Sequence, residues 1–278
     1  MLRREIDMDN EDKKTPHDAH GFTIIELLVS LLLSSFLMLA VIKIFISNQL
    51  TYGIQQSVSS IQEQGRYLTQ ELTEGFMHAG YSQTGGLKDS IRILNGTNAN
   101  DVSVTRAGAS GEQYSANASG GGGLHDQIVI LLEGGADCYG VDNWPTGTQI
   151  HWKYYYVDSE NYLVCQDSKN NIERISGRVE AFQLQYGVDL SGEAGQPNTY
   201  VSSPTEDQNI VSIRFAVVVK SHDSVTTTAD YPDNHTMQIF NESFANGTSS
   251  GQINFKDGRL RRMFFSTVRL RNSGFNAL

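Results

Sequence analysis

The 278-residue sequence contains only two cysteines and five prolines, and it has no concentrated run of lysine and arginine. Binding to the phosphates of nucleic acids needs such a basic surface, and the formal net charge of −10 opposes it. The seven histidines include no H-E-x-x-H pair, the zinc-binding pattern of many metalloproteases. The composition therefore argues against a nucleic-acid-binding protein and against a metalloprotease of that type.

Two short motifs contain catalytic residue types but lack the setting that catalysis requires. Residues 247–251 fit the G-x-S-x-G pattern, which needs a strand before the serine and a helix after it, yet polar turn residues surround this copy. His222, Asp223 and Ser224 are consecutive, and consecutive side chains on a strand point to opposite faces. We therefore predict no catalytic residue, metal or cofactor, although loop Asp and Asn residues leave calcium binding open.

The longest apolar run extends from Phe22 to Ile46 and contains two charged residues, Glu26 and Lys43. At about 1.5 Å per residue, a helix of this length spans roughly 37 Å, more than the ~30 Å hydrocarbon core of a bilayer. A signal peptide has a shorter apolar core followed by small residues, whereas this run continues into an amphipathic stretch. Residues 22–46 are therefore predicted to form a transmembrane helix that is retained.

The basic residues on either side of this segment predict its orientation. Four of them precede it, whereas the next one after Lys43 is Arg66. Lysine and arginine near a membrane end tend to stay in the cytoplasm. We expect a cytoplasmic N-terminus and, in a bacterium, a periplasmic domain that contains most of the chain.

Residues 47–80 carry apolar side chains at intervals of three and four, which is typical of an amphipathic helix. The stripe consists of Leu50, Ile54, Val58, Ile61, Gly65, Leu68, Leu72 and Phe76. We expect it to pack on the protein's own globular domain, and partner binding stays open for the turns nearest the membrane. Gly53 and Gly65 would permit bending, and Gly80 is suited to end the helix in a left-handed conformation.

Residues 81–278 alternate between strand-like runs and turn residues, which predicts a β-rich periplasmic domain. The predicted strands are Gln127–Glu133, Gln149–Val157, Asn161–Cys165, Val179–Val188, Val211–Lys220 and Met263–Leu270. Residues 158–160 predict a hairpin between the second and third of these runs. The expected fold class is α+β, with a long N-terminal helix packed on an antiparallel sheet.

Cys138 and Cys165 both lie well beyond the membrane segment, and on an oxidising side they can form a disulfide. Closing a loop of about 28 residues would stabilise the fold by roughly 3 to 4 kcal/mol on the chain-entropy estimate. A metal site is the weaker alternative, because neither cysteine has a second Cys or His at ligand spacing.

The sequence GFTIIELLV at residues 21–29 resembles the type IV prepilin signature. This resemblance implies that residues 1–21 are a leader, that a prepilin peptidase cuts between Gly21 and Phe22, and that the new Phe22 amine is methylated. Glu26 is costly inside an apolar helix, and it could pair with the Phe22 amine of a neighbouring subunit. Two features depart from the family: the leader is long and net acidic, and Lys43 replaces a helix-kinking proline, so we expect a straighter helix.

Later motifs resemble the PilW-type minor pilins, among them the Gly-Arg of the amphipathic helix and the Ala-Gly-Tyr at its end. Further resemblance lies at 138–140, 162–165, 185–189, 211–214 and 262–272. It implies a minor pilin in a priming or tip complex that is held in the inner membrane until it enters the pilus fibre. The implied partners are other minor pilins, the major pilin, the inner-membrane assembly platform and a tip adhesin. Residues 82–126 and 190–209 lie outside the resemblance.

Two other functions fit parts of the sequence. The J-type minor pseudopilin of a type II secretion system resembles the chain in the same helix and sheet plan. A membrane-anchored periplasmic hydrolase or binding protein would use the turn at residues 247–251 and would retain residues 1–21. Genomic neighbours distinguish the two pilin-like alternatives, and N-terminal analysis tests the third.

Overall fold

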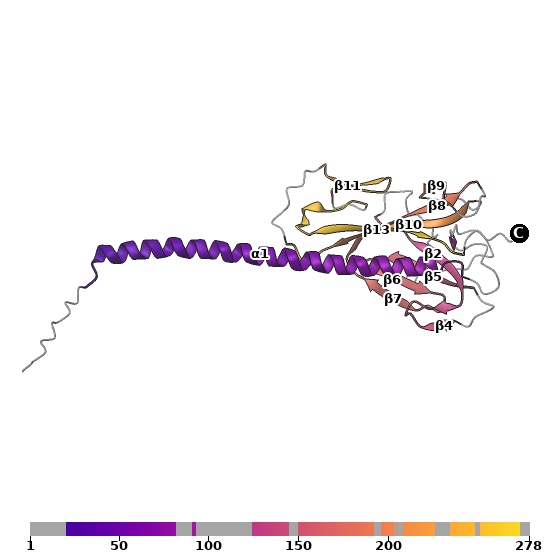
Figure 1. Cartoon of the computed structure of the whole chain (residues 1–278), viewed down its shortest axis with the longest axis horizontal. Helices are drawn as coiled ribbons and strands as arrows, with labels where there is room; N and C mark the ends of the chain where they lie inside the picture. Colours follow the sequence, from indigo (N-terminus) through magenta and orange to yellow (C-terminus); the bar gives the residue numbers. More distant parts are fainter. Residues whose placement is uncertain are drawn as a thin grey trace, which may run out of the picture. The chain divides into compact units, whose positions relative to one another are not determined.

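The computed structural model describes residues 21–81, 91–92, 124–144, 150–191, 196–202, 204, 208–225, 234–247 and 251–272. The chain has two compact units, Met1–Gln49 and Leu50–Leu278. Its elements (Figure 1) are α1 (Ile24–Met77), β1 (Ile91–Arg92), β2 (Ile128–Glu133), β3 (Gly135–Ala136), β4 (Asp142–Trp144), β5 (Ile150–Val157), β6 (Leu163–Asp167), β7 (Ile172–Ser176), β8 (Val179–Asp189), β9 (Thr199–Val201), β10 (Asn209–Lys220), β11 (Thr236–Ile239), β12 (Glu242–Ala245), the 3-10 helix η1 (Phe255–Asp257) and β13 (Arg261–Arg269).

Helix α1 is continuous through Gly53 and Gly65 and ends at Met77. A turn follows, in which Gly80 has a φ angle of +74° and donates its backbone N–H to the carbonyl of Leu131 at 2.7 Å. Glycine adopts this left-handed conformation without the steric cost that a Cβ atom brings. The expected end of the helix near Gly80 is thus confirmed.

The strands of the second unit form two larger sheets, where the sequence led us to expect one. Their strand orders are β1-β2-β5-β6-β7 and β13-β10-β8-β9, and β3-β4 and β11-β12 form separate pairs. All named strand pairs are antiparallel. Each predicted strand is present to within two residues. The strands that the sequence did not predict are short, and several are largely exposed, so they carry little hydrophobic alternation.

The predicted hairpin at residues 158–160 is confirmed, because β5 and β6 pair across this turn. Asp158 fixes its geometry: its Oδ1 accepts hydrogen bonds from the backbone N–H groups of Glu160 at 2.9 Å and Tyr162 at 2.8 Å. Short polar side chains that bond to the backbone in this way are typical of turns.

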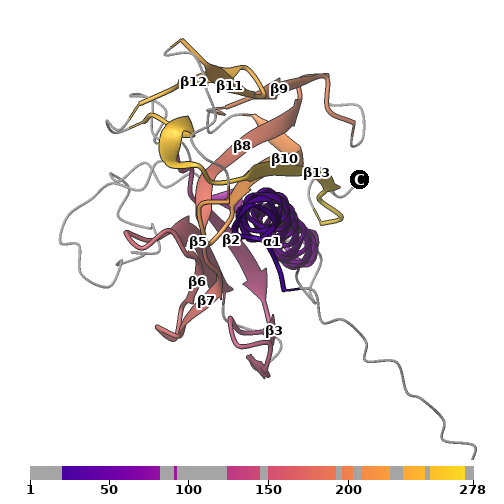
Figure 2. The same cartoon turned by 90° about the vertical axis from the view of Figure 1, so that its left-hand side faces the viewer.

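The main core lies between α1 and the two larger sheets (Figure 2). Ile61, Leu68, Leu72 and Phe76 of the predicted stripe are buried, which confirms that the stripe packs on the globular domain. The Phe76 ring makes edge-to-face contacts with Tyr155 of β5 and Phe215 of β10, at centroid distances of 5.7 and 5.6 Å. One side chain of the helix therefore joins both sheets.

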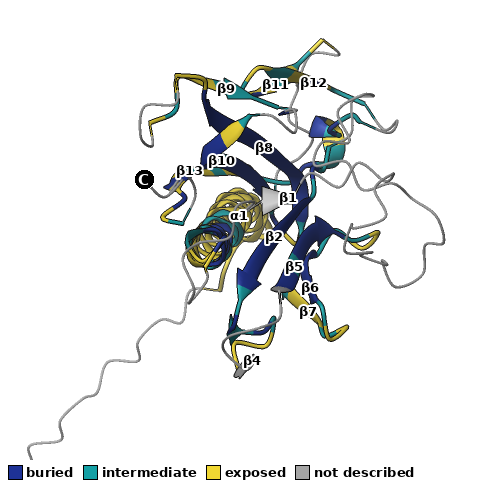
Figure 3. Cartoon of the chain, turned by 90° about the vertical axis from the view of Figure 1, so that its right-hand side faces the viewer, coloured by how far each residue is buried: buried dark blue, intermediate teal, exposed yellow. Residues whose placement is uncertain are grey.

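Strands β2, β8 and β10 are buried along almost their whole length, as the dark blue of Figure 3 shows, so both of their faces are covered. On the second sheet, Ala216 and Val218 of β10 pack against Ile239 and Phe244 of the β11–β12 hairpin and against Phe255 of η1. The first sheet has a second apolar cluster on its outer face, formed by Val129, Leu131, Trp152, Tyr154, Tyr156 and Val164. Burial on both faces explains the near-continuous apolar character of β2 and β10.

Residues 124–126 connect the two sheets, because they run along the edge of β8 and then continue into β2. The backbone N–H of Phe182 donates to the carbonyl of Leu124 at 2.9 Å, and Asp126 Oδ2 accepts the N–H of Leu184 at 2.7 Å.

Asp126 is only 1% exposed, and burial raises the pKa of its carboxyl to about 8. Burial and the positive charge of Lys220 lower the pKa of the adjacent His125 to about 4.

Gly65 lies against the Phe264 ring of β13, so closely that a Cβ atom there would overlap the ring. We expect Gly65→Ala to destabilise the fold by about 1–2 kcal/mol, because overpacking outweighs the gain in helix propensity. Gly53→Ala is the matched control: nothing lies within 4 Å of the place that an alanine Cβ would occupy there, so it should be neutral or stabilising by up to about 1 kcal/mol. Urea unfolding measures both, and equal effects would contradict the packing role of Gly65.

The pKa shifts of residues 125 and 126 predict a pH dependence of stability. Asp126 holds its proton more tightly when folded, so stability falls as pH rises from about 4 to about 8. The lowered pKa of His125 acts oppositely, and its contribution is lost as pH falls from 6.5 to about 4. Between pH 6.5 and 8, His125 does not oppose the effect of Asp126, and the expected loss of stability is about 2 kcal/mol.

We therefore expect Asp126→Asn to abolish the loss of stability between pH 6.5 and 8, since the amide oxygen can still accept the Leu184 N–H without carrying a charge. Unfolding of the wild type and the variant at pH 6.5 and 8.5 measures the effect. Asp223→Asn is the control, because that side chain is 77% exposed. An unchanged pH slope in Asp126→Asn would show that another group titrates.

Candidate functional site

Gly21 and Phe22 immediately precede helix α1, and the Phe22 side chain is 83% exposed. Thr23 caps the helix: its carbonyl accepts the Leu27 N–H at 3.2 Å and its hydroxyl accepts the Glu26 N–H at 3.3 Å. Glu26 is therefore the third helical residue, in the T-x-x-E arrangement of a capping box. A carboxylate in the first turn also interacts favourably with the positive end of the helix dipole.

The first part of α1 is built for an apolar solvent. Its most apolar 18-residue window has a mean hydropathy of 2.5, none of that window is buried inside the protein, and α1 is the one such helix in the part of the chain that the structure describes. The hydroxyls of Ser30, Ser34 and Ser35 donate to carbonyls three residues earlier at 2.7–2.9 Å. Polar groups satisfied within the helix need no water, so these serines are compatible with lipid.

A disulfide joins Cys138, in the loop between β3 and β4, to Cys165 of β6. Buried aspartates fix the two backbone turns beside it. Asp137 Oδ1 accepts two loop N–H groups at 3.0 Å, and Asp167 Oδ2 accepts the Cys138 N–H at 3.2 Å. The bridge and these hydrogen bonds attach the 137–141 loop to the first sheet.

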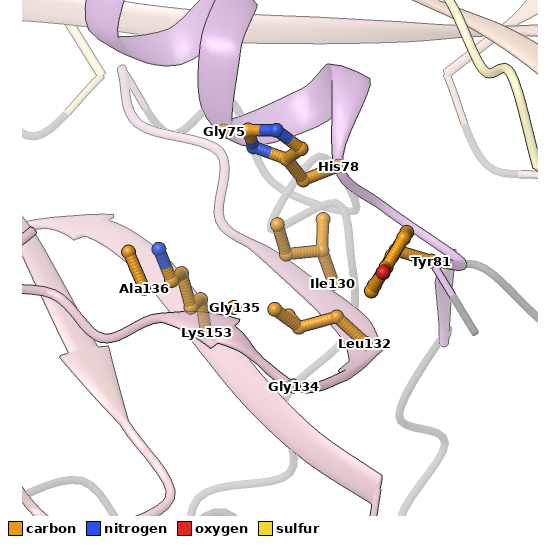
Figure 4. A pocket seen from close by; sticks show the side chains of 9 residues that line it. All are labelled: Gly75, His78, Tyr81, Ile130, Leu132, Gly134, Gly135, Ala136 and Lys153. Carbon is orange, nitrogen blue, oxygen red and sulfur yellow. The ribbon is translucent and has the colours of Figure 1, made fainter. Parts of the chain in front are cut away.

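A pocket of about 240 Å³ lies where the end of α1 meets β2, β5 and the Gly134–Ala136 segment. Figure 4 shows His78, Tyr81 and Lys153 placed around the apolar side chains of Ile130 and Leu132. Burial lowers the pKa of Lys153, an effect that the carboxylates of Glu71, Asp137 and Asp167 oppose. The volume is below that of pockets for drug-sized ligands, so it admits only a small group.

The sequence did not predict this pocket. Its residues come from three separate segments, and Lys153 and His78 stand in patterns that any strand or helix could show. The paired glycines 134 and 135, both with positive φ angles, were the available signal, since they mark a sharp turn at the end of β2.

The catalytic motifs considered in the sequence do not form an active site in the described residues. One expectation about them was wrong: β10 ends at Lys220, so His222 and Asp223 lie in a bend, where His222 Nε2 and Asp223 Oδ1 are 3.8 Å apart. Both side chains are more than two-thirds exposed, whereas a catalytic relay needs enclosed surroundings. The serine of the G-x-S-x-G motif, Ser249, lies outside the described residues. Among the residues that are described, no group of three or more His, Cys, Asp or Glu side chains could hold a metal ion.

The family model of the type IV pilus-assembly protein W matches residues 139–272, and the prokaryotic N-terminal methylation motif matches residues 16–42. Together these matches are those of a PilW-type minor pilin. The first covers most of the β strands and Cys165 of the disulfide, and the second covers Gly21, Phe22 and Glu26.

A type IV-like pilin from Thermus thermophilus is similar at 15% sequence identity, over 53% of this chain and 78% of that protein. The TM-score is 0.30. No curated protein matches the chain significantly in sequence.

The family matches agree with the geometry of the described residues. The chain has a role in type IV pilus assembly, as a structural subunit that acts together with other pilins and the assembly machinery. The methylation motif and the apolar part of α1 indicate membrane anchoring. The cleavage, methylation and pairing roles of Gly21, Phe22 and Glu26 stay predictions.

Proposed function

We propose that the protein is a minor pilin of the priming or tip complex of a type IV pilus, with no enzymatic activity of its own. The observation that carries this proposal is the division of α1. Its first part exposes apolar side chains, whereas from Ile61 onward the apolar stripe of the helix is buried in the core of the β-rich domain. An apolar helical surface that the subunit does not bury itself is suited first to lipid and then to the helices of neighbouring subunits.

In this proposal the leader 1–21 lies in the cytoplasm, residues 22–46 span the inner membrane, and residues 47–80 and 81–278 are periplasmic. Prepilin peptidase cuts after Gly21, Phe22 is methylated, and the assembly platform later extracts the subunit into the fibre. Other minor pilins, the major pilin and a tip adhesin are the proposed partners, and nucleic acid is not among them.

The alternative is a J-type minor pseudopilin of a type II secretion system, which would share the helix and the β-rich domain. Neighbouring genes for pilus assembly or for secretion distinguish these two functions. N-terminal sequencing of the mature protein tests both against an anchored hydrolase, because a chain that still begins at Met1 would contradict any pilin-like function.

Glu26 is proposed to pair with the amino group of Phe22 in the next subunit. Glu26→Ala and Glu26→Gln should both be inserted and cut normally, yet enter the fibre at least about ten-fold less, because an unpaired charge in an apolar bundle costs on the order of 3 kcal/mol. The ratio of protein in sheared pili to protein in the membrane measures this. Thr23→Val is the control, since it removes the helix cap and leaves the charge. Normal incorporation of Glu26→Gln would rule out the pairing.

Deletion of the gene tests the proposed function directly. We expect far fewer surface pili and loss of twitching, both restored by the wild-type gene, because a priming complex is needed to start a fibre. Electron microscopy of pili and a twitching assay are the measurements. Unchanged piliation in the deletion strain, together with a secretion defect, would instead support the pseudopilin alternative.

A further inference from the structure

The outer edge of the second sheet is strand β13, which Figure 2 shows at the end of that sheet. Within the described residues β13 pairs only with β10, over nine residue pairs without a register shift. The ladder is closed at both ends by hydrogen bonds from the Ser221 N–H to the Leu260 carbonyl at 2.8 Å and from the Leu270 N–H to the Val211 carbonyl at 2.9 Å. In the part of the chain that the structure describes, the side of β13 away from β10 is therefore an open strand edge.

The register determines which backbone groups lie on this open edge. In an antiparallel pair, alternate residues direct both their N–H and their C=O toward the partner strand. Leu260 and Leu270 bond to the β10 side, so the even-numbered residues between them do the same. Met263, Phe265 and Thr267 therefore present their backbone donors and acceptors outward.

The same three residues also present their side chains to solvent. Phe265 is 67% exposed, Met263 is 38% exposed and Thr267 is exposed. Phe265 and Met263 stand opposite Ala216 and Val218, which belong to the apolar cluster on the outer face of this sheet. The apolar outer face of this sheet thus continues onto its edge strand β13, where Phe265 is exposed. Folded proteins usually protect such an edge, because it is a template for pairing with another chain.

The charge on this edge indicates what would pair with it. Arg262, Arg269 and Arg271 are exposed, and no ion pair joins any of them to a carboxylate in the described part of the chain. The protein as a whole has a net charge of −10, so this basic rim is local. A second copy pairing through the same edge would place arginines beside arginines, which is unfavourable.

We propose that the open edge of β13 binds an extended, acidic segment of a different pilin subunit by β-strand addition. The added strand bonds to the outward backbone groups of residues 263–267, covers Phe265 with its own apolar side chains, and places carboxylates near Arg262 and Arg269. This proposal rests on the proposed function, because it names the surface by which the domain joins its neighbours during pilus assembly.

Site-specific photo-cross-linking in cells tests the proposal on the full-length protein. A photoreactive phenylalanine analogue replaces Phe265, and the control carries it at Tyr139, which is similarly exposed (54%) on the loop beside the disulfide. We expect an adduct from position 265 with another pilin subunit, whose cross-linked peptide is an acidic strand or extended segment. An adduct with a second copy of this chain, with an apolar helix or with lipid would overturn the proposal.

Backbone variants separate strand addition from ordinary side-chain contact. Thr267→Pro removes an outward N–H and leaves the bonds to β10 in place, and edge strands tolerate proline at such a position. It should lower the cross-link yield by about five-fold relative to Thr267→Val, which retains the N–H. Arg262→Glu with Arg269→Glu should lower it further, and unchanged membrane levels and protease resistance show that the variants fold.

Equal yields from Thr267→Pro and Thr267→Val would overturn strand addition. If the protein is still found in sheared pili in that case, the proposed function stands and only the surface is wrong. If the wild-type protein is found neither in pili nor cross-linked to another pilin, the proposed function itself fails.

Discussion

The packing of Phe76 between Tyr155 and Phe215 is the interaction on which the architecture of the β-rich unit depends. Each larger sheet has an apolar inner face that must be shielded from solvent. Both inner faces pack on the same helix. Phe76 contacts a central strand of each sheet at the same point, so the helix position and the placement of the two sheets are coupled. Gly65 and Gly75 serve the same constraint, because side chains of Phe264 and Tyr155 occupy the space where their Cβ atoms would be.

Helix α1 meets two different physical demands along its length. Beyond its first turn, its N-terminal part is a continuous helix with backbone hydrogen bonds inside the segment, and its serine hydroxyls bond to its own carbonyls, as an apolar solvent requires. From Ile61 onward the same helix supplies one side of a protein core. Leu50 is still exposed and Ile54 and Val58 are partly buried, so the change between the two environments is gradual. In the proposed function the subunit moves from a membrane into a fibre, and this division would serve both places, because the exposed apolar surface is not needed for the subunit's own fold.

Buried polar groups give the β-rich unit its specific connections. Arg261 bonds to Asp257 and, at 3.1 Å from Nη2 to Oε1, to Glu180, and Lys220 lies 3.4 Å from the same glutamate. These contacts connect the start of β13 to β8 across β10. Such pairs contribute less to net stability than their number suggests, because burying the charges is costly, yet removing one partner would leave an unpaired buried charge. Their effect is to fix the position of β13 and thus of its open edge.

The sequence by itself determined the elements whose signals are local: the apolar run at 22–46, the stripe from Ile61 to Phe76, and strands such as β8 and β10 with strong apolar patterns. Only the tertiary structure decided how the strands divide into two sheets. It also decided that β13 lies at the edge of one sheet and which residues from distant segments line the pocket. Pairing partners and sheet order depend on contacts between residues far apart in the chain, and hydrophobic periodicity carries no information about them. For the same reason the sequence does not distinguish the exposed Phe265 from an ordinary strand residue.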